Sequence, residues 1–172
     1  MKIPMFALQH GAATGAIIIL LKLVGYLLGV EAMMSGWSWF GQMVFVVAGM
    51  FVAVAATRNA EEGLITFGRA FGVALLTAAV ATLLALLMDI ILGTLIDPGL
   101  SEKLMRLTRE ELDSSGFFML LSKEDTEQFM SELKWAMKPI GQCVSWLLGL
   151  IFWSGVALIV GAITKRDDPQ KF

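Results

Sequence analysis

The sequence predicts an all-α integral membrane protein: a four-helix bundle with an amphipathic helical insert between the third and fourth spans. The first observation is composition, since 57% of the 172 residues are hydrophobic and only 16% are charged. The mean hydropathy of +0.75 is far above that of a soluble domain of this size. The second is four apolar windows of about 20 residues, the length that crosses a bilayer in helix. The third is a polar stretch of about forty residues between the last two windows.

Composition also excludes several classes of protein. The net charge of −2 and the scattered basic residues argue against a nucleic-acid binder, and the hydropathy argues against a soluble enzyme or a disordered chain. Cys143 is the single cysteine, so no intrachain disulfide or cysteine-based metal site is expected. His10 is the single histidine, and an interfacial, structural role is the simplest interpretation of it. We expect no cofactor and no metal.

The first two apolar windows predict a tight helical hairpin. They cover about residues 8–30 and 37–57, and only Glu31 to Gly36 separates them. The first could be mistaken for a secretory signal, but its apolar stretch is too long and Lys22 interrupts it. It is therefore expected to be the first membrane-spanning helix.

The third and fourth windows cover about residues 66–96 and 139–164. The third is apolar except for Arg69 and Asp89, and Arg69 is expected to reach the headgroups beside it. Lys165 and Arg166 end the fourth. The four spans and the insert predict a single membrane domain over residues 1–172.

Basic residues near the span ends predict the orientation. In a four-span topology, six basic residues fall on the same side of the membrane: Lys2, Arg58, Arg69, Lys165, Arg166 and Lys171. The other side has a short loop with Glu31 and the insert. The insert contains nine acidic residues and five basic residues. Because basic loops stay in the cytoplasm, we expect both termini there and the insert outside, in a bacterial inner membrane.

The insert, about residues 97–136, predicts two surface helices. Leucines recur at three-to-four spacing from Leu100 to Leu107 among charged residues, which is typical of an amphipathic helix. Gly116 breaks this helix before the apolar segment FFMLL, and Ser122 with Asp125 resembles a capping box for the second helix. Pro139 is expected at the joint with the fourth span. The apolar faces either lie on the outer membrane surface or dock a partner protein.

Four segments together resemble a known family: HGAATGAI in the first span, TRNAEEGLITFGRAFGVALL before and within the third, the acidic insert, and KPIGQ with LIVGAITKR in the fourth. They are similar to bacterial integral membrane proteins of the family DUF4199, a domain of unknown function. The resemblance covers nearly the whole chain, and residues 63–72 are its most specific part. It implies four spans with an insert before the last, and it implies no activity and no catalytic residues.

Lys22 and Asp89 are a candidate intramembrane polar pair. Each charge costs about 2.5–3.5 kcal/mol at mid-bilayer. Lys22 lies about 21 Å along its helix from Leu8, and Asp89 about 30 Å from Arg69, so both fall in the outer half of the membrane. If the first and third spans are neighbours, the two charges can meet. They then form a structural pair or a proton or ion relay, and otherwise each reaches the outer headgroups separately.

Three glycine pairs are candidates for close helix packing, because a spacing of four residues puts both members on one helix face. They are Gly11 with Gly15, Gly25 with Gly29, and Gly68 with Gly72. Packing within the bundle is the simpler interpretation of each pair, and a dimer interface is the alternative.

The leading functional hypothesis is a small non-enzymatic membrane protein, an accessory or assembly subunit that presents the insert to a partner. Its expected partners are membrane lipids, copies of itself or a larger membrane complex, and no nucleic acid. The alternative is a small transporter or an ion or proton pathway that uses Lys22 and Asp89. An enzyme ranks third, because the sequence contains no hydrolase elbow, zinc-protease, phosphate-loop or dinucleotide motif.

Overall fold

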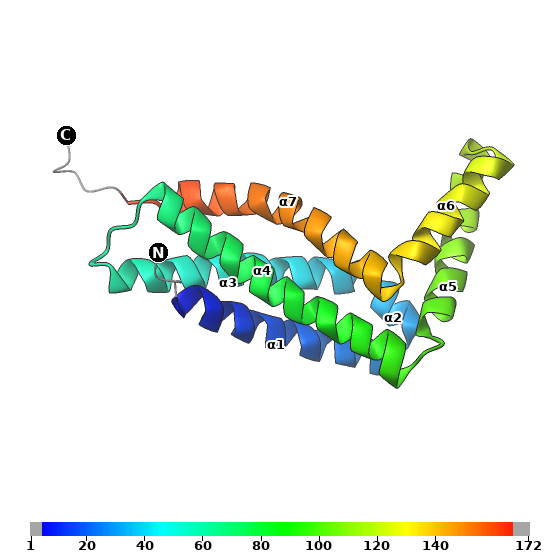
Figure 1. The fold of residues 1–172 in the computed structure, drawn as a ribbon, viewed down its shortest axis with the longest axis horizontal. Coiled ribbons are helices and arrows are strands. Elements are labelled where there is room, and N and C mark those ends of the chain that lie inside the picture. The colour runs from blue at the N-terminus through cyan, green and yellow to red at the C-terminus, as the bar shows by residue number, and fades with distance from the viewer. Residues whose placement is uncertain (1–4, 167–172) are drawn as a thin grey trace.

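The computed structural model describes residues 5–166 and folds them into a helical bundle with a side arm (Figure 1). The elements in chain order are α1 (Met5–Leu28), α2 (Val30–Met34), α3 (Gly36–Ala60), α4 (Phe67–Ile91), the π-helical turn η1 (Leu92–Ile96), α5 (Leu100–Ser114), the 3₁₀ turn η2 (Phe117–Leu120), α6 (Lys123–Ala136) and α7 (Pro139–Thr164). Four are long and apolar enough to cross a membrane: α1, α3, α4 continued by η1, and α7. The prediction of a four-span helical bundle is therefore confirmed.

The connection between the first two spans differs from the expected loop. Gly29 has φ +115°, a backbone conformation that side chains rarely allow, and α1 ends before it at Leu28. The residues that follow form the short helix α2, and α3 begins at Gly36. The first span is thus shorter at its end than the predicted 8–30, because a glycine in this conformation stops the helix.

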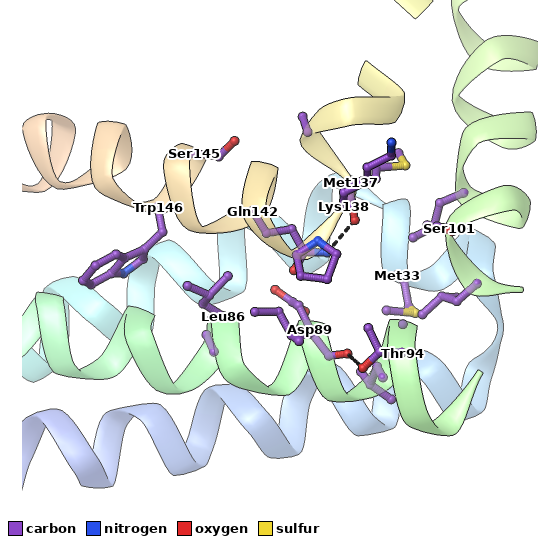
Figure 2. Close-up of a pocket in the computed structure, with 18 of the residues that line it drawn as sticks. Met33, Leu86, Asp89, Thr94, Ser101, Met137, Lys138, Gln142, Ser145 and Trp146 are labelled. Carbon is purple, nitrogen blue, oxygen red and sulfur yellow. Dashed lines mark hydrogen bonds between the residues drawn. The ribbon is translucent and has the colours of Figure 1, made fainter. Parts of the chain in front are cut away.

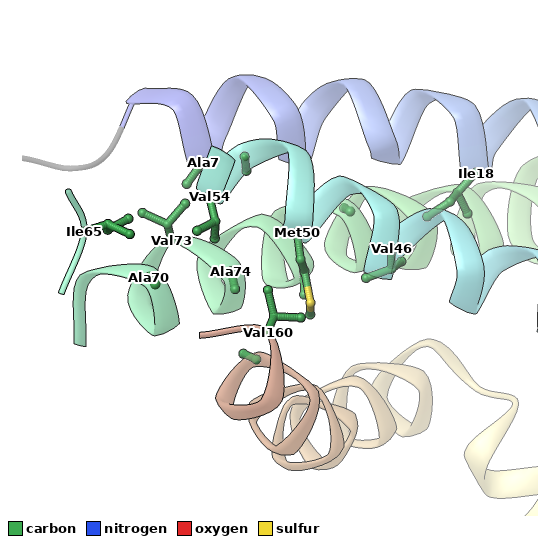
Figure 3. Packing of buried hydrophobic residues seen from close by; sticks show 14 of the residues in the cluster. Ala7, Ile18, Val46, Met50, Val54, Ile65, Ala70, Val73, Ala74 and Val160 are labelled. Atoms are coloured by element: carbon green, nitrogen blue, oxygen red, sulfur yellow. The ribbon is translucent and has the colours of Figure 1, made fainter. Parts of the chain in front are cut away.

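The central helix of the bundle is α4, which packs against α1, α3 and α7. Small side chains permit this, since alanines recur along its buried face: Ala70, Ala74, Ala78, Ala81 and Ala85. Around them lies a core of larger residues that includes Ile18, Met50 and Val160 (Figure 3). Where apolar side chains face lipid on the outside, close backbone contact rather than water exclusion holds the helices together.

The Gly11 and Gly15 face is one such contact, between α1 and α4. A Cβ atom added to Gly11 would lie 2.8 Å from Cβ of Val80, and one added to Gly15 would lie 2.7 Å from Cδ1 of Leu84. Both distances are shorter than real carbon contacts. These two glycines therefore pack within the bundle.

The other two predicted glycine pairs do not form close contacts between helices within residues 5–166. Gly29 lies outside α1, so it shares no helical face with Gly25, whose added Cβ would be 3.6 Å from Cγ of Met33. Added Cβ atoms on Gly68 and Gly72 would have no neighbour within 4 Å among the described residues. That face of α4 is open, and its role in a dimer stays a prediction.

One end of the bundle holds the α3–α4 loop, the start of α1 and the end of α7 (Figure 1). Glu62 and Gly63 turn the loop with positive φ values of 58° and 85°. Ile65 and Arg166 then exchange two backbone hydrogen bonds, of 3.0 and 2.9 Å, which tie the loop to the end of α7. The first and last described residues thus lie at the same end, as an even number of spans requires.

The opposite end carries the arm, which comprises α5, η2 and α6 and projects sideways from the bundle (Figure 1). Gly116, with φ +74°, separates α5 from η2, as predicted. Ser122 caps α6, and its hydroxyl oxygen accepts from the backbone N–H of Asp125 at 3.1 Å. Pro139 occupies the first turn of α7, also as predicted.

The tip of the arm is apolar and exposed. The ring of Phe117 packs against that of Phe129, with centroids 5.6 Å apart, and closes the turn between the two helices. Met119 and Leu120 lie beyond it and are 88% and 83% exposed. The arm therefore presents an exposed apolar tip away from the bundle.

Tryptophans mark the same end of the bundle. Trp37 and Trp39, at the start of α3, are 82% and 67% exposed, and Trp135, near the end of α6, is half exposed. Tryptophan prefers the headgroup level of a membrane. This end, where the arm joins the bundle, is thus expected to lie at a membrane surface.

Candidate functional site

The structure brings Lys22 and Asp89 into contact. Lys22 Nζ donates to both carboxylate oxygens of Asp89 at 2.8 Å, which joins the C-terminal parts of α1 and α4. The lysine side chain is 17% exposed and the aspartate side chain 37%. Because each carboxylate oxygen can accept more than one hydrogen bond, Asp89 keeps capacity for a further donor.

Asp89 also borders a chamber of about 890 Å³. The chamber lies where the end of α4 and η1 meet the start of α7, with α5 and α6 on its outer side (Figure 2). It is partly open to the surroundings. Ligand pockets for small molecules commonly have this size. The π turn shapes one wall, since the N–H of Asp97 bonds to the carbonyl of Leu92 at 2.8 Å and the chain turns there into the arm.

Much of the chamber wall is apolar. Leu86, Ile90 and Leu92 line it from α4 and η1, and Trp146 and Trp153 line it from α7. The indole N–H of Trp146 donates to Oγ1 of Thr82 at 3.0 Å, so its polar atom is paired and its ring fills the inner part of the wall. Such an apolar wall can contact the hydrocarbon part of a ligand.

The polar part of the wall contains an unpaired acceptor. Gln142 uses Nε2 to donate to the backbone carbonyl of Met137 at 2.9 Å (Figure 2). Its Oε1 is buried and has no hydrogen-bond partner among the described residues. Burying such an atom without a donor costs about 1–3 kcal/mol. A ligand or water that brings a donor to this point would remove that cost.

Charged side chains complete the chamber. Glu102 of α5 and Lys134 and Lys138, at the end of α6 and the start of α7, line it beside Asp89. Within residues 5–166 neither lysine makes an ion pair. Lys103 is instead paired with Asp97 at 2.7 Å, at the foot of the arm. The hydrogen bond from Lys103 lowers the pKa of Asp97 and, in return, raises the pKa of Lys103.

The half of the bundle farther from the arm is closed. Val54 of α3, Ala74 and Ala78 of α4 and Val160 of α7 are at most 1% exposed there. An added Cβ on Gly161 would lie 3.1 Å from the backbone nitrogen of Phe71, which shows how closely α7 approaches α4 at this end. The chamber therefore lies in the half of the bundle nearer the arm, beside this packed core.

The remaining candidate residues lie outside the chamber. Arg69 donates from Nε to Oε1 of Glu61 at 3.1 Å and so braces the α3–α4 loop. His10 is partly buried in α1, near the closed end. Across residues 5–166, no cluster of three His, Cys, Asp or Glu side chains is placed to hold a metal ion.

Sequence reasoning named Lys22 and Asp89 as a candidate pair, which the structure brings into contact, and missed the chamber. The missed residues do carry a signal, because Gln142, Ser145, Trp146 and Gly149 repeat at spacings of three and four along the fourth span. This spacing puts polar and small residues on one face of an otherwise apolar helix. Thr82 and Asp89 lie seven residues apart, on a similar face of the third span.

Comparison with known proteins gives one match. The model of a family described as "Protein of unknown function (DUF4199)" matches residues 9–166. No curated protein and no solved structure matches the chain.

Proposed function

The chain belongs to the DUF4199 family, and we propose that it is a small non-enzymatic accessory protein of the membrane that binds an amphiphilic molecule in its chamber. The observation that carries this proposal is the chamber itself, which joins an apolar wall to the Asp89 carboxylate and to Gln142, a lining residue whose buried Oε1 is unpaired. Such a combination suits a molecule with one oily and one polar part.

The position of the chamber supports a membrane lipid as the occupant. It lies toward the end of the bundle that carries Trp37, Trp39 and Trp135, where we expect the headgroup level of the membrane. A lipid headgroup there would meet the polar groups of the chamber, while its chains would follow the apolar side chains of α4 and α7. The packed core at the other end favours binding over passage across the membrane.

The orientation follows the charge bias of the loops. We infer that the chamber and the arm face the outside of a bacterial inner membrane, with the α3–α4 loop and both termini in the cytoplasm. Under this orientation the ligand comes from the outer leaflet. The exposed tip residues Met119 and Leu120 would then either enter that leaflet or contact a partner subunit.

A leucine at Gly149 tests ligand binding. Gly149 lines the chamber, and an added Cβ meets no atom within 4 Å, so a larger side chain can begin there in open space. We expect Gly149→Leu to lower the amount of co-purifying lipid at least about fivefold, because the side chain occupies ligand volume. The measurement is native mass spectrometry of protein purified in mild detergent.

Gly155→Leu is the matched control. Gly155 also lies in α7 with open space around an added Cβ, but it does not line the chamber. It should retain lipid as the unchanged protein does. Equal retention by the two variants, or the absence of bound lipid from the unchanged protein, would refute ligand binding in the chamber.

A transporter or ion pathway is the second candidate, and the contact of Asp89 with the chamber favours it. A pathway also requires a second conformation in which the core around Ala74 and Val160 opens. Flux of ions or protons through proteoliposomes that depends on Asp89 would support this candidate. Lipid binding without flux would support the accessory role.

A further inference from the structure

We propose that the chamber selects a phosphodiester lipid headgroup that is anionic and carries hydroxyl donors, the chemistry of phosphatidylglycerol. This inference rests on the proposed binding of an amphiphile and adds the class of headgroup. Three features carry it: an unpaired acceptor, an acceptor shared with Lys22, and a positive balance of charge once Lys22, behind Asp89, is counted with the lining side chains.

The unpaired acceptor favours a ligand that brings a hydrogen-bond donor. Because Gln142 Nε2 is held by the carbonyl of Met137, the orientation of the amide is fixed and Oε1 remains the unpaired atom. A choline headgroup has no N–H or O–H to offer, and neither has a bare phosphodiester. A glycerol headgroup has two hydroxyl groups. The chamber therefore favours a headgroup with donors.

Asp89 offers a second acceptor in the same wall. Lys22 Nζ bonds both carboxylate oxygens from the α1 side, and Lys22 itself does not line the chamber. The carboxylate is the more exposed partner of the pair, and it does line the chamber. A hydroxyl can donate to it there, whereas an ammonium would lie close to the positive charge of Lys22.

The charges of the chamber favour a negative headgroup. Lys134 and Lys138 line it without ion-pair partners in residues 5–166, and Lys22 lies behind Asp89. Two carboxylates, Asp89 and Glu102, oppose these three ammonium groups. One positive charge is left over, which a single phosphodiester neutralises. Basic pockets between membrane helices bind anionic headgroups by this complementarity.

The test is lipid competition. Purified full-length protein is mixed with phosphatidylglycerol, phosphatidylethanolamine and phosphatidylcholine of identical chains, and bound lipid is counted by native mass spectrometry. We expect phosphatidylglycerol to be retained about tenfold over phosphatidylcholine, with the hydrogen bond to the neutral Gln142 Oε1 supplying at least about threefold of this ratio. Phosphatidylethanolamine, which has donors but no net charge, should fall between them.

Two variants, each with a matched control, test which chamber residues produce the headgroup preference. Gln142→Leu should reduce the preference over phosphatidylcholine to about threefold or less. Gln128→Leu, on the arm and outside the chamber, should leave it unchanged. Lys134→Gln should reduce the preference over phosphatidylethanolamine, while Lys123→Gln, at the far end of α6, should not.

The outcomes separate two kinds of failure. If the three lipids bind equally, if phosphatidylethanolamine binds best, or if both chamber variants keep the original selectivity, the headgroup inference is overturned while lipid binding stands. If no lipid binds the unchanged protein, or if Gly149→Leu leaves binding intact, the proposed function itself fails.

Discussion

Lys22→Met is expected to lower the free energy of unfolding by about 2 kcal/mol, because the substitution leaves the Asp89 carboxylate without its cation at the arm end of the bundle. The loss is smaller than the 3–5 kcal/mol typical of a fully buried pair, since both side chains are partly exposed. Unfolding of the detergent-purified protein by sodium dodecyl sulfate, followed by tryptophan fluorescence, measures it.

The double variant separates pairing from independent effects. Asp89→Asn removes the charge that Lys22→Met leaves unpaired, so the double variant should be more stable than the sum of the two single losses predicts, by about 1–2 kcal/mol. Additive losses would show that the side chains stabilise the protein separately, as two residues that each reach the headgroups would.

Gly11→Leu is expected to destabilise the bundle by about 3 kcal/mol, at the upper end of the range for overpacking. Even a Cβ at this position would lie 2.8 Å from Cβ of Val80 and 3.0 Å from the backbone carbonyl oxygen of Thr77. A leucine must therefore push α1 away from the central helix α4 and open the core beside it. The thermal unfolding temperature in detergent measures the loss.

Gly72→Leu provides the control, because it makes the same chemical change where an added Cβ has no neighbour within 4 Å. It should leave the unfolding temperature of the monomer nearly unchanged. A large loss from Gly72→Leu together with a small one from Gly11→Leu would contradict the arrangement of α1 and α4. A loss of dimer alone from Gly72→Leu would support the prediction that this face mediates self-association.

The four spans could be predicted because a bilayer leaves the chain few choices. Each crossing needs about 20 apolar residues in a helix that satisfies its own backbone, and this requirement is visible in the sequence. The cap at Ser122 and the break at Gly116 follow from equally local chemistry. The end of α1 at Leu28 was harder to place, because Gly29 could continue a helix or stop it and only its positive φ decides.

The site could be predicted only in part. The positions of Lys22 and Asp89 along their helices put them at one depth, and the packing of α1 on α4 then joins them. The chamber depends instead on how α6 turns into α7 at Pro139 and on the π turn that redirects the chain after Leu92. Both are tertiary features, as is the hydrogen bond that fixes Gln142 and leaves its Oε1 unpaired.

Labelling of single cysteines in intact cells tests most directly the claim that the chamber faces the outer leaflet. Cys143 is the single native cysteine, so Cys143→Ser gives a background into which Ser115→Cys on the arm or Asn59→Cys near the end of α3 is placed. A membrane-impermeant maleimide should label position 115 in intact cells and position 59 only after permeabilisation. Labelling of both positions from the same side, or of position 59 alone in intact cells, would contradict the account.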